Sequence, residues 1–329
     1  MDPSTAPEIP VIDISGFLAG TDRAAVAAAV ADACRTVGFL QIVGHGIETE
    51  ALDAAYAAMA SLVELPEPDK DAHQCPNGHP FRGYSRHTHP DGRVAQERFQ
   101  INRFDDAAAA AAAGVPARYG DYFVANVWPD LDGFEPALRS LFARTQLLGA
   151  RIMELFEQAL GVAPGSLVRS VEPNVSCLAV NHYPASGVVG TPDAEPVILL
   201  REHPDSGTLT ILHQRGTYEG LQILDPGGEW RPVPVREDAF VVNIGELMAR
   251  WTNNRWRSTR HRVVGSPDPA DHRTTITTFH LPAVDTTVAP LAELVGDATP
   301  AYEAVTPYEW ERMFLETVSA TYERTRAPA

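Results

Sequence analysis

The amino-acid sequence predicts a mainly β protein with flanking helices, in which a sandwich or barrel-like core occupies the second half of the chain. After Asn174, short alternating or β-branched runs separated by Gly, Pro and Asp recur about every ten residues, which is typical of sandwiches and barrels. Because no internal repeat or flexible linker interrupts the 329 residues, we expect a single domain sharing one core. Its expected parts are an N-terminal region at about 8–130, a core at about 174–283 and a helical tail at about 284–329.

The first half alternates strands with amphipathic helices. The alanine-rich segment from Asp22 to Val37 carries apolar residues three or four positions apart, which predicts a helix, and Gly38 suits its C-terminus. A run of seven alanines at 107–113 predicts a short helix or a surface insertion. The other elements expected here are strands at 9–14 and 39–43 and helices at 49–65 and 136–160.

The stretch from Asp69 to Arg103 is polar and rich in Pro, Gly and His, and we expect it to be irregular. Its histidines and cysteine lack the paired spacing of a zinc site, so a loop with exposed or substrate-facing histidines is favoured and zinc is the alternative. These residues are His73, Cys75, His79, His87 and His89. Long loops in compact enzymes often bind ligands. The candidate substrate contacts of this stretch are Arg82, Tyr84, Phe99, Gln100 and Arg103.

The second half is predicted to consist of short strands followed by one terminal helix. The strands have alternating or β-branched character, and the terminal segment has helical periodicity. The strands are expected at 175–183, 197–200, 208–212, 221–224, 240–244, 260–264 and 274–281, and the helix at 307–326.

Composition limits the possible partners. The formal net charge is −17 and 44% of the residues are hydrophobic, which allows a large core but argues against binding to nucleic acid or an anionic membrane. The three cysteines are too few and too far apart for a disulfide framework. The first ten residues lack a signal pattern, and no run approaches about 18 apolar residues. We expect a cytoplasmic protein acting on a small molecule; the sequence gives no indication of oligomeric state.

Two histidines and one carboxylate in the strand-rich half have the composition of an iron site with open coordination positions. His203 and Asp205 are two residues apart and point the same way if they lie on a strand or its frayed end. Pro204 between them suits an edge or strand-end position, and His261 lies in a second predicted strand. Either histidine alone would more often be an ordinary surface or core residue, but together the three predict a metal site.

Arg273 and Thr275 begin the strand that follows His261, and the turn at 265–269 predicts a hairpin that places the two strands side by side. Two imidazoles and a carboxylate leave three positions on a ferrous ion, enough for a chelating 2-oxo acid and dioxygen. A planar guanidinium can clamp the far carboxylate of that acid through two parallel hydrogen bonds. The hydroxyl of Thr275 would add a further donor.

In order and identity, these motifs resemble the isopenicillin N synthase-like family of non-haem iron(II), 2-oxoglutarate-dependent dioxygenases, over nearly the whole chain. Near the N-terminus the resemblance rests on segments 9–13, 38–46 and 126–129, the last reading Asn-Val-Trp-Pro. The later matches are Asn-His-Tyr-Pro at 181–184, His-Pro-Asp at 203–205, Gly-Leu-Gln at 220–222, Asn-Ile-Gly at 243–245, Trp-Thr-Asn at 251–253 and Ser-Thr-Arg-His-Arg at 258–262.

The resemblance implies a double-stranded β-helix, or jelly-roll, with helices packed outside. It also implies residue roles. The catalytic iron ligands would be His203, Asp205 and His261. The distal carboxylate of 2-oxoglutarate would be bound by Arg273 and Thr275, with Asn181 and Tyr183 close to this cosubstrate.

Three positions stand out against the family pattern. Thr275 stands where serine is usual, and the hydroxyl is kept. His182 stands where tyrosine is common, which we expect to alter the pocket. Arg201 shares the strand parity of His203; we expect a surface ion pair there, with contact to an acidic substrate as the alternative.

The activity implied by the resemblance is oxidation of an unactivated C–H bond of a small metabolite, by hydroxylation, desaturation or oxidative cyclisation, with release of succinate and CO2. Iron(II), 2-oxoglutarate and dioxygen are the implied cofactors and cosubstrates, ascorbate is an expected stimulant, and secondary-metabolite or antibiotic biosynthesis is the expected setting. One alternative is an iron oxidase that closes rings without 2-oxoglutarate, against which Arg273 and Thr275 weigh. Another is a non-catalytic jelly-roll binding protein, against which the intact metal set weighs.

Overall fold

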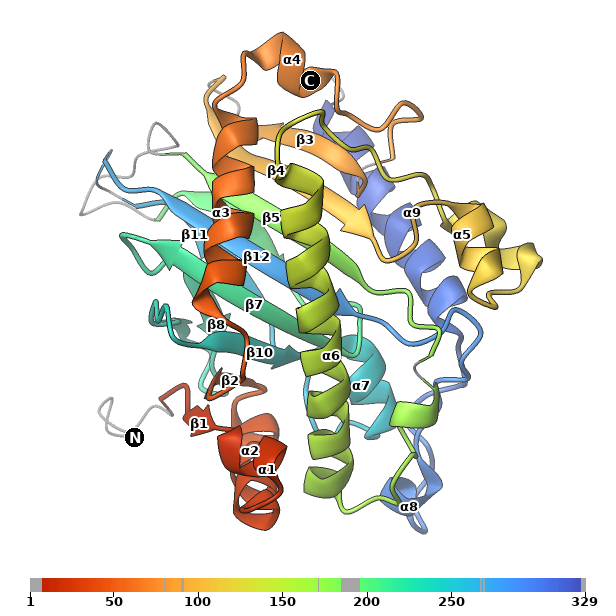
Figure 1. Ribbon diagram of the computed structural model, residues 1–329. Helices are drawn as coiled ribbons and strands as arrows, with labels where there is room; N and C mark the ends of the chain where they lie inside the picture. The colour runs from red at the N-terminus through yellow and green to blue at the C-terminus, as the bar shows by residue number, and fades with distance from the viewer. Residues whose placement is uncertain are drawn as a thin grey trace.

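The computed structural model describes residues 8–79, 81–89, 92–170, 172–184, 196–266, 268 and 270–326, so most of the N-terminal segment inspected for a signal lies outside the described residues. The strands form two sheets (Figure 1). The larger sheet contains β1 (Val11–Asp13), β2 (Phe39–Val43), β3 (Gly83–Thr88), β4 (Val94–Asn102), β5 (Cys177–Tyr183), β7 (Leu209–Gly216), β10 (Phe240–Ile244) and β12 (Arg273–His280). The smaller sheet contains β6 (Ile198–His203), β8 (Leu221–Leu224), β9 (Trp230–Pro232) and β11 (His261–Val264).

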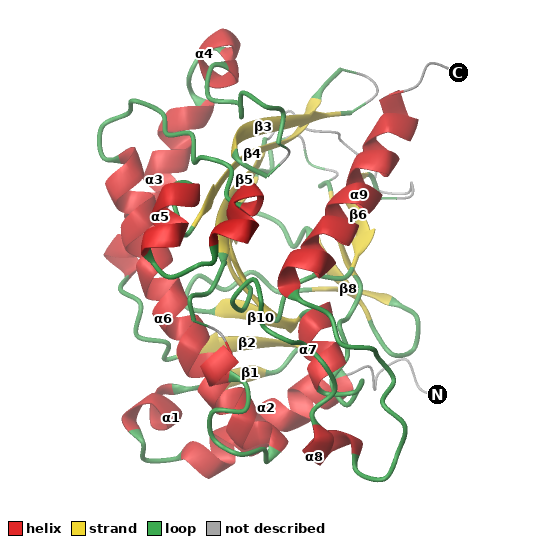
Figure 2. Cartoon of the chain, turned by 90° about the vertical axis from the view of Figure 1, so that its right-hand side faces the viewer, coloured by secondary structure: helices red, strands yellow, loops and turns green. Residues whose placement is uncertain are grey.

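The strand order is β1-β2-β10-β7-β12-β5-β4-β3 in the larger sheet and β6-β11-β8-β9 in the smaller one. Around the sheets lie the helices α1 (Ser15–Ala19), α2 (Arg23–Thr36), α3 (Thr49–Val63), α4 (Glu67–Asp71), α5 (Ala107–Ala112), α6 (Phe134–Leu160), α7 (Glu246–Trp251), α8 (Ala292–Val295) and α9 (Pro307–Arg326). Figure 2 shows α3 and α6 on one side of the larger sheet and α9 on the other. None of the helices in the described ranges is long and apolar enough to cross a lipid bilayer.

The two faces of the larger sheet have different surroundings, because successive side chains along a strand point to opposite sides and the face that turns toward the smaller sheet carries polar residues beside a small apolar cluster. On the apolar face, Ile211 of β7 and Ile276 of β12 join one hydrophobic cluster with Phe142, Leu148 and Ile152 of α6. The opposite face, here called the inner face, turns toward the smaller sheet. Its buried polar side chains, paired across neighbouring strands, are Thr210, Gln214, Asn243, Thr275 and Asn181.

The stretch expected to be irregular, 69–103, instead contains the end of α4 and the antiparallel pair β3 and β4. In β4 the residues Ala95, Glu97, Phe99 and Ile101 alternate with less buried neighbours. The sequence does not show this alternation as a hydrophobic pattern, because Glu97, one of the buried positions, is charged. Glu97 accepts hydrogen bonds from Lys70 (2.6 Å) and Tyr84 (2.7 Å), which make its burial possible.

The predicted hairpin between the strands of His261 and Arg273 is wrong. β11 pairs with β6 and β8 in the smaller sheet, whereas β12 pairs with β5 and β7 in the larger one. The turn after β11 therefore carries the chain from one sheet to the other. The remaining expected elements are found with shifts of a few residues, and the alanine run forms α5. The elements α1, α4, β9, α7 and α8 were not predicted.

Candidate metal centre and cosubstrate site

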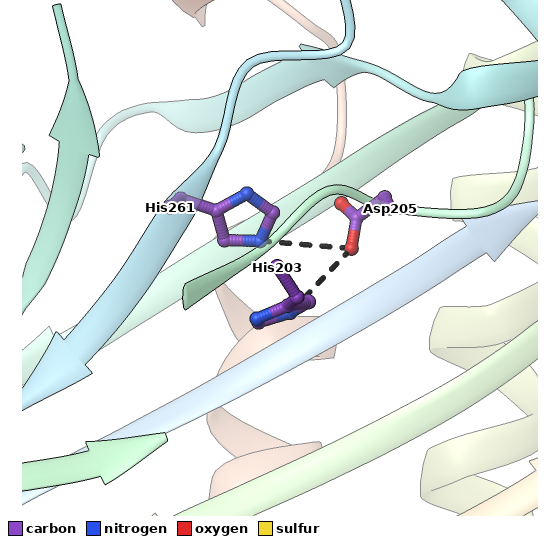
Figure 3. Close-up of side chains that lie close together, drawn as sticks. All are labelled: His203, Asp205 and His261. Carbon is purple, nitrogen blue, oxygen red and sulfur yellow. Dashed lines mark ion pairs between the residues drawn. The ribbon is translucent and has the colours of Figure 1, made fainter. Parts of the chain in front are cut away.

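His203, Asp205 and His261, here called the triad, converge at the end of the smaller sheet (Figure 3). β6 and β11 are antiparallel with His203 opposite His261, and Asp205 follows two residues after His203. The Nε2 atoms of His261 and His203 lie 3.6 and 4.0 Å from Oδ1 of Asp205, and one ligand atom from each residue lies within 4.8 Å of the others. A cross-strand pair thus brings together two histidines that are 58 positions apart in the sequence.

Hydrogen bonds to the backbone fix the orientation of both imidazoles. Nδ1 of His203 lies 2.7 Å from the carbonyl oxygen of Arg201, and Nδ1 of His261 lies 3.2 Å from that of Thr259. A carbonyl oxygen only accepts, so each Nδ1 carries the proton and each Nε2 lone pair is available to a metal. Burial lowers the pKa of His203, and His261 beside it lowers it further, which favours the neutral ligand form.

The two carboxylate oxygens of Asp205 have different surroundings. Oδ2 accepts hydrogen bonds from Thr210 Oγ1 at 2.5 Å and Asn243 Nδ2 at 2.7 Å, so Oδ1 is the oxygen left to face the imidazoles. Burial by itself raises the pKa of Asp205. The two histidines and these two hydrogen bonds outweigh burial and leave the pKa below its usual value. Two imidazoles and one carboxylate form a donor set suited to a ferrous ion with open positions.

The turn that carries Asp205 is held by the start of α7. The backbone N–H groups of Glu246 and Leu247 donate to the carbonyl oxygens of Asp205 (2.8 Å) and Gly207 (3.0 Å). Gly245 makes this contact possible, because a Cβ at this position would overlap the Gly207 carbonyl oxygen. The Asn-Ile-Gly motif therefore contributes both Asn243 to the carboxylate and Gly245 to the close approach of the two segments.

Arg273 lies on the inner face of β12 and is 1% exposed. Its Nη2 donates to Gln214 Oε1 at 3.0 Å, and its Cζ lies 5.4 Å from the ring centroid of Tyr183. Within the described residues Nε has no hydrogen-bond partner. A buried guanidinium with spare donors fits a position that binds a carboxylate, since an unpaired buried charge is costly.

The other predicted cosubstrate residues surround Arg273. Thr275 accepts a hydrogen bond from Asn181 Nδ2 at 3.3 Å. Gln96 Nε2 donates to both Asn181 Oδ1 (3.1 Å) and Tyr183 Oη (3.0 Å). The residues present therefore fit 2-oxoglutarate, with an anion-binding end at Arg273 and hydroxyl and amide groups beside it.

Three of the five predicted substrate contacts lie elsewhere. Tyr84 and Phe99 belong to the core on the apolar face of the larger sheet, where Phe99 packs edge-on against Phe134 with the ring centroids 4.8 Å apart. Arg103 forms a 2.6 Å ion pair with the exposed Glu172. The strand parity of β4 explains the error, because Phe99 has the opposite parity to the inner-face residues.

The other two candidates, Arg82 and Gln100, are buried on the inner side; Gln100 Nε2 contacts Cys177 Sγ at 3.2 Å. Sequence reasoning missed Arg98, which shares the parity of Gln100, as well as the supporting roles of Thr210, Asn243 and Gln214. Parity in β4 would have identified Arg98 if the strand had been recognised.

The three positions that stood out against the family pattern, and the zinc alternative, can also be placed. Thr275 keeps its hydroxyl on the inner face. His182 points to the opposite side, where Nδ1 lies 2.9 Å from Thr274 Oγ1, so the expectation that it alters the pocket is wrong. Arg201 is exposed. Among the described residues the triad is the one cluster able to hold a metal, so the histidine-rich stretch forms no zinc site there.

Comparison with known proteins identifies the family. Residues 9–131 match the family described as non-haem dioxygenase in morphine synthesis N-terminal, and residues 174–282 match the 2OG-Fe(II) oxygenase superfamily. Gibberellin 20 oxidase 1-D of Triticum aestivum is 33% identical over 310 residues, which cover 93% of this chain and 80% of that protein. The chain belongs to the 2OG-Fe(II) oxygenase superfamily.

This oxygenase is similar to further proteins over comparable lengths. Validamycin A dioxygenase of Streptomyces hygroscopicus subsp. limoneus is 30% identical over 307 residues, covering 89% of this chain and 80% of that protein. The crystal structure of a full-length Neurospora crassa protein in complex with alpha-KG aligns with a TM-score of 0.78 and 26% identity, covering 94% of this chain and 96% of that one. The predicted jelly-roll fold is confirmed. The predicted enzyme class, an Fe(II)- and 2-oxoglutarate-dependent dioxygenase that uses dioxygen, is confirmed as well.

Proposed function

We propose that this oxygenase uses the triad to bind Fe(II) and Arg273 with Thr275 to bind the distal carboxylate of 2-oxoglutarate, and that it oxidises an unactivated C–H bond of a small metabolite. For hydroxylation the balance is substrate, O2 and 2-oxoglutarate giving hydroxylated product, succinate and CO2. Desaturation or ring closure would yield water in place of the new hydroxyl. The observation that carries the proposal is that one strand supports both the converging triad and Arg273, a buried guanidinium whose Nε has no hydrogen-bond partner among the described residues.

That strand is β7. Thr210, which holds Asp205, and Gln214, which holds Arg273, are four residues apart on one face of β7, a separation of about 13 Å along the strand. The residues that support the metal ligand and the guanidinium are therefore separated by a span that suits a short dicarboxylate, which would meet the metal with one end and Arg273 with the other.

When bound, the iron would supply activation of dioxygen coupled to decarboxylation of the 2-oxo acid. The protein residues hold the reacting groups in place. Thr210 and Asn243 keep Asp205 Oδ1 directed at the metal position, the Arg201 and Thr259 carbonyls orient the imidazoles, and the buried inner face limits access of water.

A small organic substrate is supported by the charge of the chain and by its relatives. The net charge of −17 disfavours nucleic acid, and the names of the relatives refer to small molecules, namely gibberellin and validamycin A. We infer a role in secondary metabolism. The three unpaired cysteines support a cytoplasmic location, and a single domain is supported by β1 to β4 joining the larger sheet.

The test is succinate formation from 2-oxoglutarate in the presence of Fe(II) and ascorbate, with and without a panel of small molecules. His203→Ala should abolish succinate formation. Arg273→Ala should raise the KM for 2-oxoglutarate steeply, and Arg273→Lys should fall between it and the wild type because it keeps the charge but loses the bidentate geometry. Arg151→Ala, at an exposed position on α6, is the matched control. Substrate oxidation without succinate, or an unchanged KM in Arg273→Ala, would contradict the proposal.

A further inference from the structure

A second arginine lies on the inner face of the larger sheet, beside the metal centre. Arg98 occupies the middle of β4 in register with Asn181 of β5. Its guanidinium lies over the ring of Phe81, with Cζ 5.1 Å from the centroid. Burial lowers the pKa of Arg98, while Cys177, Tyr183 and the triad residue Asp205 oppose the change.

Another arginine, Arg82, lies close to Arg98, which is itself partly exposed. Arg82 is 5% exposed, and its Nη1 donates to the carbonyl oxygen of Phe81. Burial raises the pKa of the Cys177 thiol to about 11, and both Arg82 and Arg98 act in the opposite direction. Both guanidiniums are therefore close to Cys177, and two like charges share one buried region.

Neither guanidinium has a carboxylate partner within the part of the chain that the structure describes. Nε of Arg82 and Nε of Arg98 are fully buried without a hydrogen bond there. The chain has acids to spare, with 43 Asp and Glu against 26 Lys and Arg. Arginines away from this region do pair with acids: Arg139, Arg215 and Arg231 reach carboxylates at 2.7, 2.6 and 2.9 Å.

Aromatic rings and one carboxyl group lie near the two arginines. The ring of Phe81 stacks on that of Phe314 from α9, with the centroids 6.4 Å apart and an interplanar angle of 23°. The carboxyl group of Glu311 on α9 interacts electrostatically with Arg82. Burial raises the pKa of Glu311 to about 7 against the influence of Ser206 and Arg82, and its Oε1 has no partner among the described residues. Figure 2 shows α9 on the side of the larger sheet opposite to α3 and α6.

We propose that Arg82 and Arg98 bind a carboxylate group of the organic substrate and hold the rest of the substrate against the metal centre. A buried unpaired guanidinium costs stability, and an incoming carboxylate would satisfy two of them with charge-assisted hydrogen bonds. The inference rests on the proposed function, because the site acts as a substrate site only if the triad is the reactive centre.

The carboxylate in question is not that of 2-oxoglutarate. Arg273 is on β12 and Arg98 is on β4, and β5 lies between these two strands. Asn181 and Tyr183 of β5 thus separate the cosubstrate position from the second anion position. One inner face carries two anion-binding groups, one for each organic reactant.

The experiment measures binding directly, without requiring turnover. Protein loaded with Fe(II) and 2-oxoglutarate in the absence of dioxygen is titrated calorimetrically with carboxylates from acetate to decanoate, phenylacetate, 3-phenylpropionate and indole-3-acetate, and with their primary amides. At least one carboxylate should bind the wild type roughly tenfold more tightly than its amide. Arg82→Gln and Arg98→Gln should each weaken that carboxylate roughly tenfold or more, and Arg98→Lys should weaken it less.

Two controls separate recognition from folding. Arg151→Gln should bind the carboxylate as the wild type does, and all variants should retain the affinity for 2-oxoglutarate. Arg98→Met removes the charge and keeps an unbranched side chain, so the ligand-free variant should unfold at a higher denaturant concentration than the wild type while losing carboxylate binding. A structural arginine would give the opposite shift.

Several results would overturn the proposal: amides that bind as tightly as carboxylates, no carboxylate that binds at all, arginine variants with wild-type affinity, or an Arg98→Gln protein that loses 2-oxoglutarate instead. Failure of the proposed function appears separately, as a wild-type protein that binds carboxylates but forms no succinate from 2-oxoglutarate under aerobic conditions.

Discussion

The two hydrogen bonds to Oδ2 of Asp205 make a quantitative prediction about iron binding. Thr210→Val removes the donor at 2.5 Å and leaves Asn243 at 2.7 Å as the remaining side-chain partner. A hydrogen bond to a charged group contributes about 1.5–3 kcal/mol, equivalent to roughly 10- to 150-fold in an equilibrium constant. Part of this is lost when the carboxylate reorients, so we expect the Kd for Fe(II) to rise roughly 10- to 100-fold.

The assay is an anaerobic titration of Fe(II) into protein with saturating 2-oxoglutarate, followed by the visible charge-transfer absorption of the ternary complex. Thr210→Ser keeps the hydroxyl and should stay within roughly threefold of the wild type. Once iron is saturating, the KM for 2-oxoglutarate should not change in Thr210→Val, because Arg273 is untouched. Wild-type iron affinity in Thr210→Val, or equal weakening in Thr210→Ser, would refute the assigned role of this hydroxyl.

Two further predictions concern stability. Gly245→Ala should destabilise the protein in chemical denaturation by more than about 2 kcal/mol, because its Cβ would overlap the Gly207 carbonyl oxygen. The control is Gly120→Ala, whose new Cβ meets only the Cβ of Ala107 at 3.7 Å and should leave the stability unchanged. Equal effects of the two substitutions would contradict this explanation. The pKa of Glu311 is raised by burial from 4.5 to about 7, so its contribution to stability is present below pH 4.5 and lost as the pH rises through about 7. In metal-free protein Glu311→Gln should therefore be more stable than the wild type at pH 8, by at most about 3 kcal/mol, and by less than about 1 kcal/mol at pH 5. A difference that does not depend on pH would refute the buried-carboxyl explanation.

Regular elements with a single strong signal were predictable from the sequence. The strands 39–43, 221–224 and 240–244 and the helix 307–326 have the expected bounds, since each carries one uninterrupted pattern between clear turn residues. The hairpin of β3 and β4 was missed because both faces of β4 carry polar residues. Gln96, Arg98 and Gln100 line the inner face, and Glu97 is neutralised in the core by Lys70, so no local window shows a hydrophobic alternation.

The composition of the site was predictable, but its spatial arrangement was only partly so. Parity along a strand tells which side chains share a face, and it placed His203 with Asp205. It does not tell which strand lies alongside. The register that sets His203 opposite His261, and the position of β12 in the other sheet, depend on long-range pairing that a single sequence does not encode locally.

The structure also explains why the missed residues are polar. A two-residue period gives the larger sheet one face that packs against the helices and one that carries the site residues beside a smaller apolar cluster. Ile211 and Ile276 pack against α6, and the intervening positions are free to carry groups such as Thr275 that contribute little to the core. The inner side also holds the guanidiniums of Arg82 and Arg98, which form no ion pair with a carboxylate among the described residues. Folding alone would favour acidic partners for them, so their absence among the described residues is best explained by ligands that bring their own negative charge, and the ligand-free protein should gain stability from each such ligand by mass action.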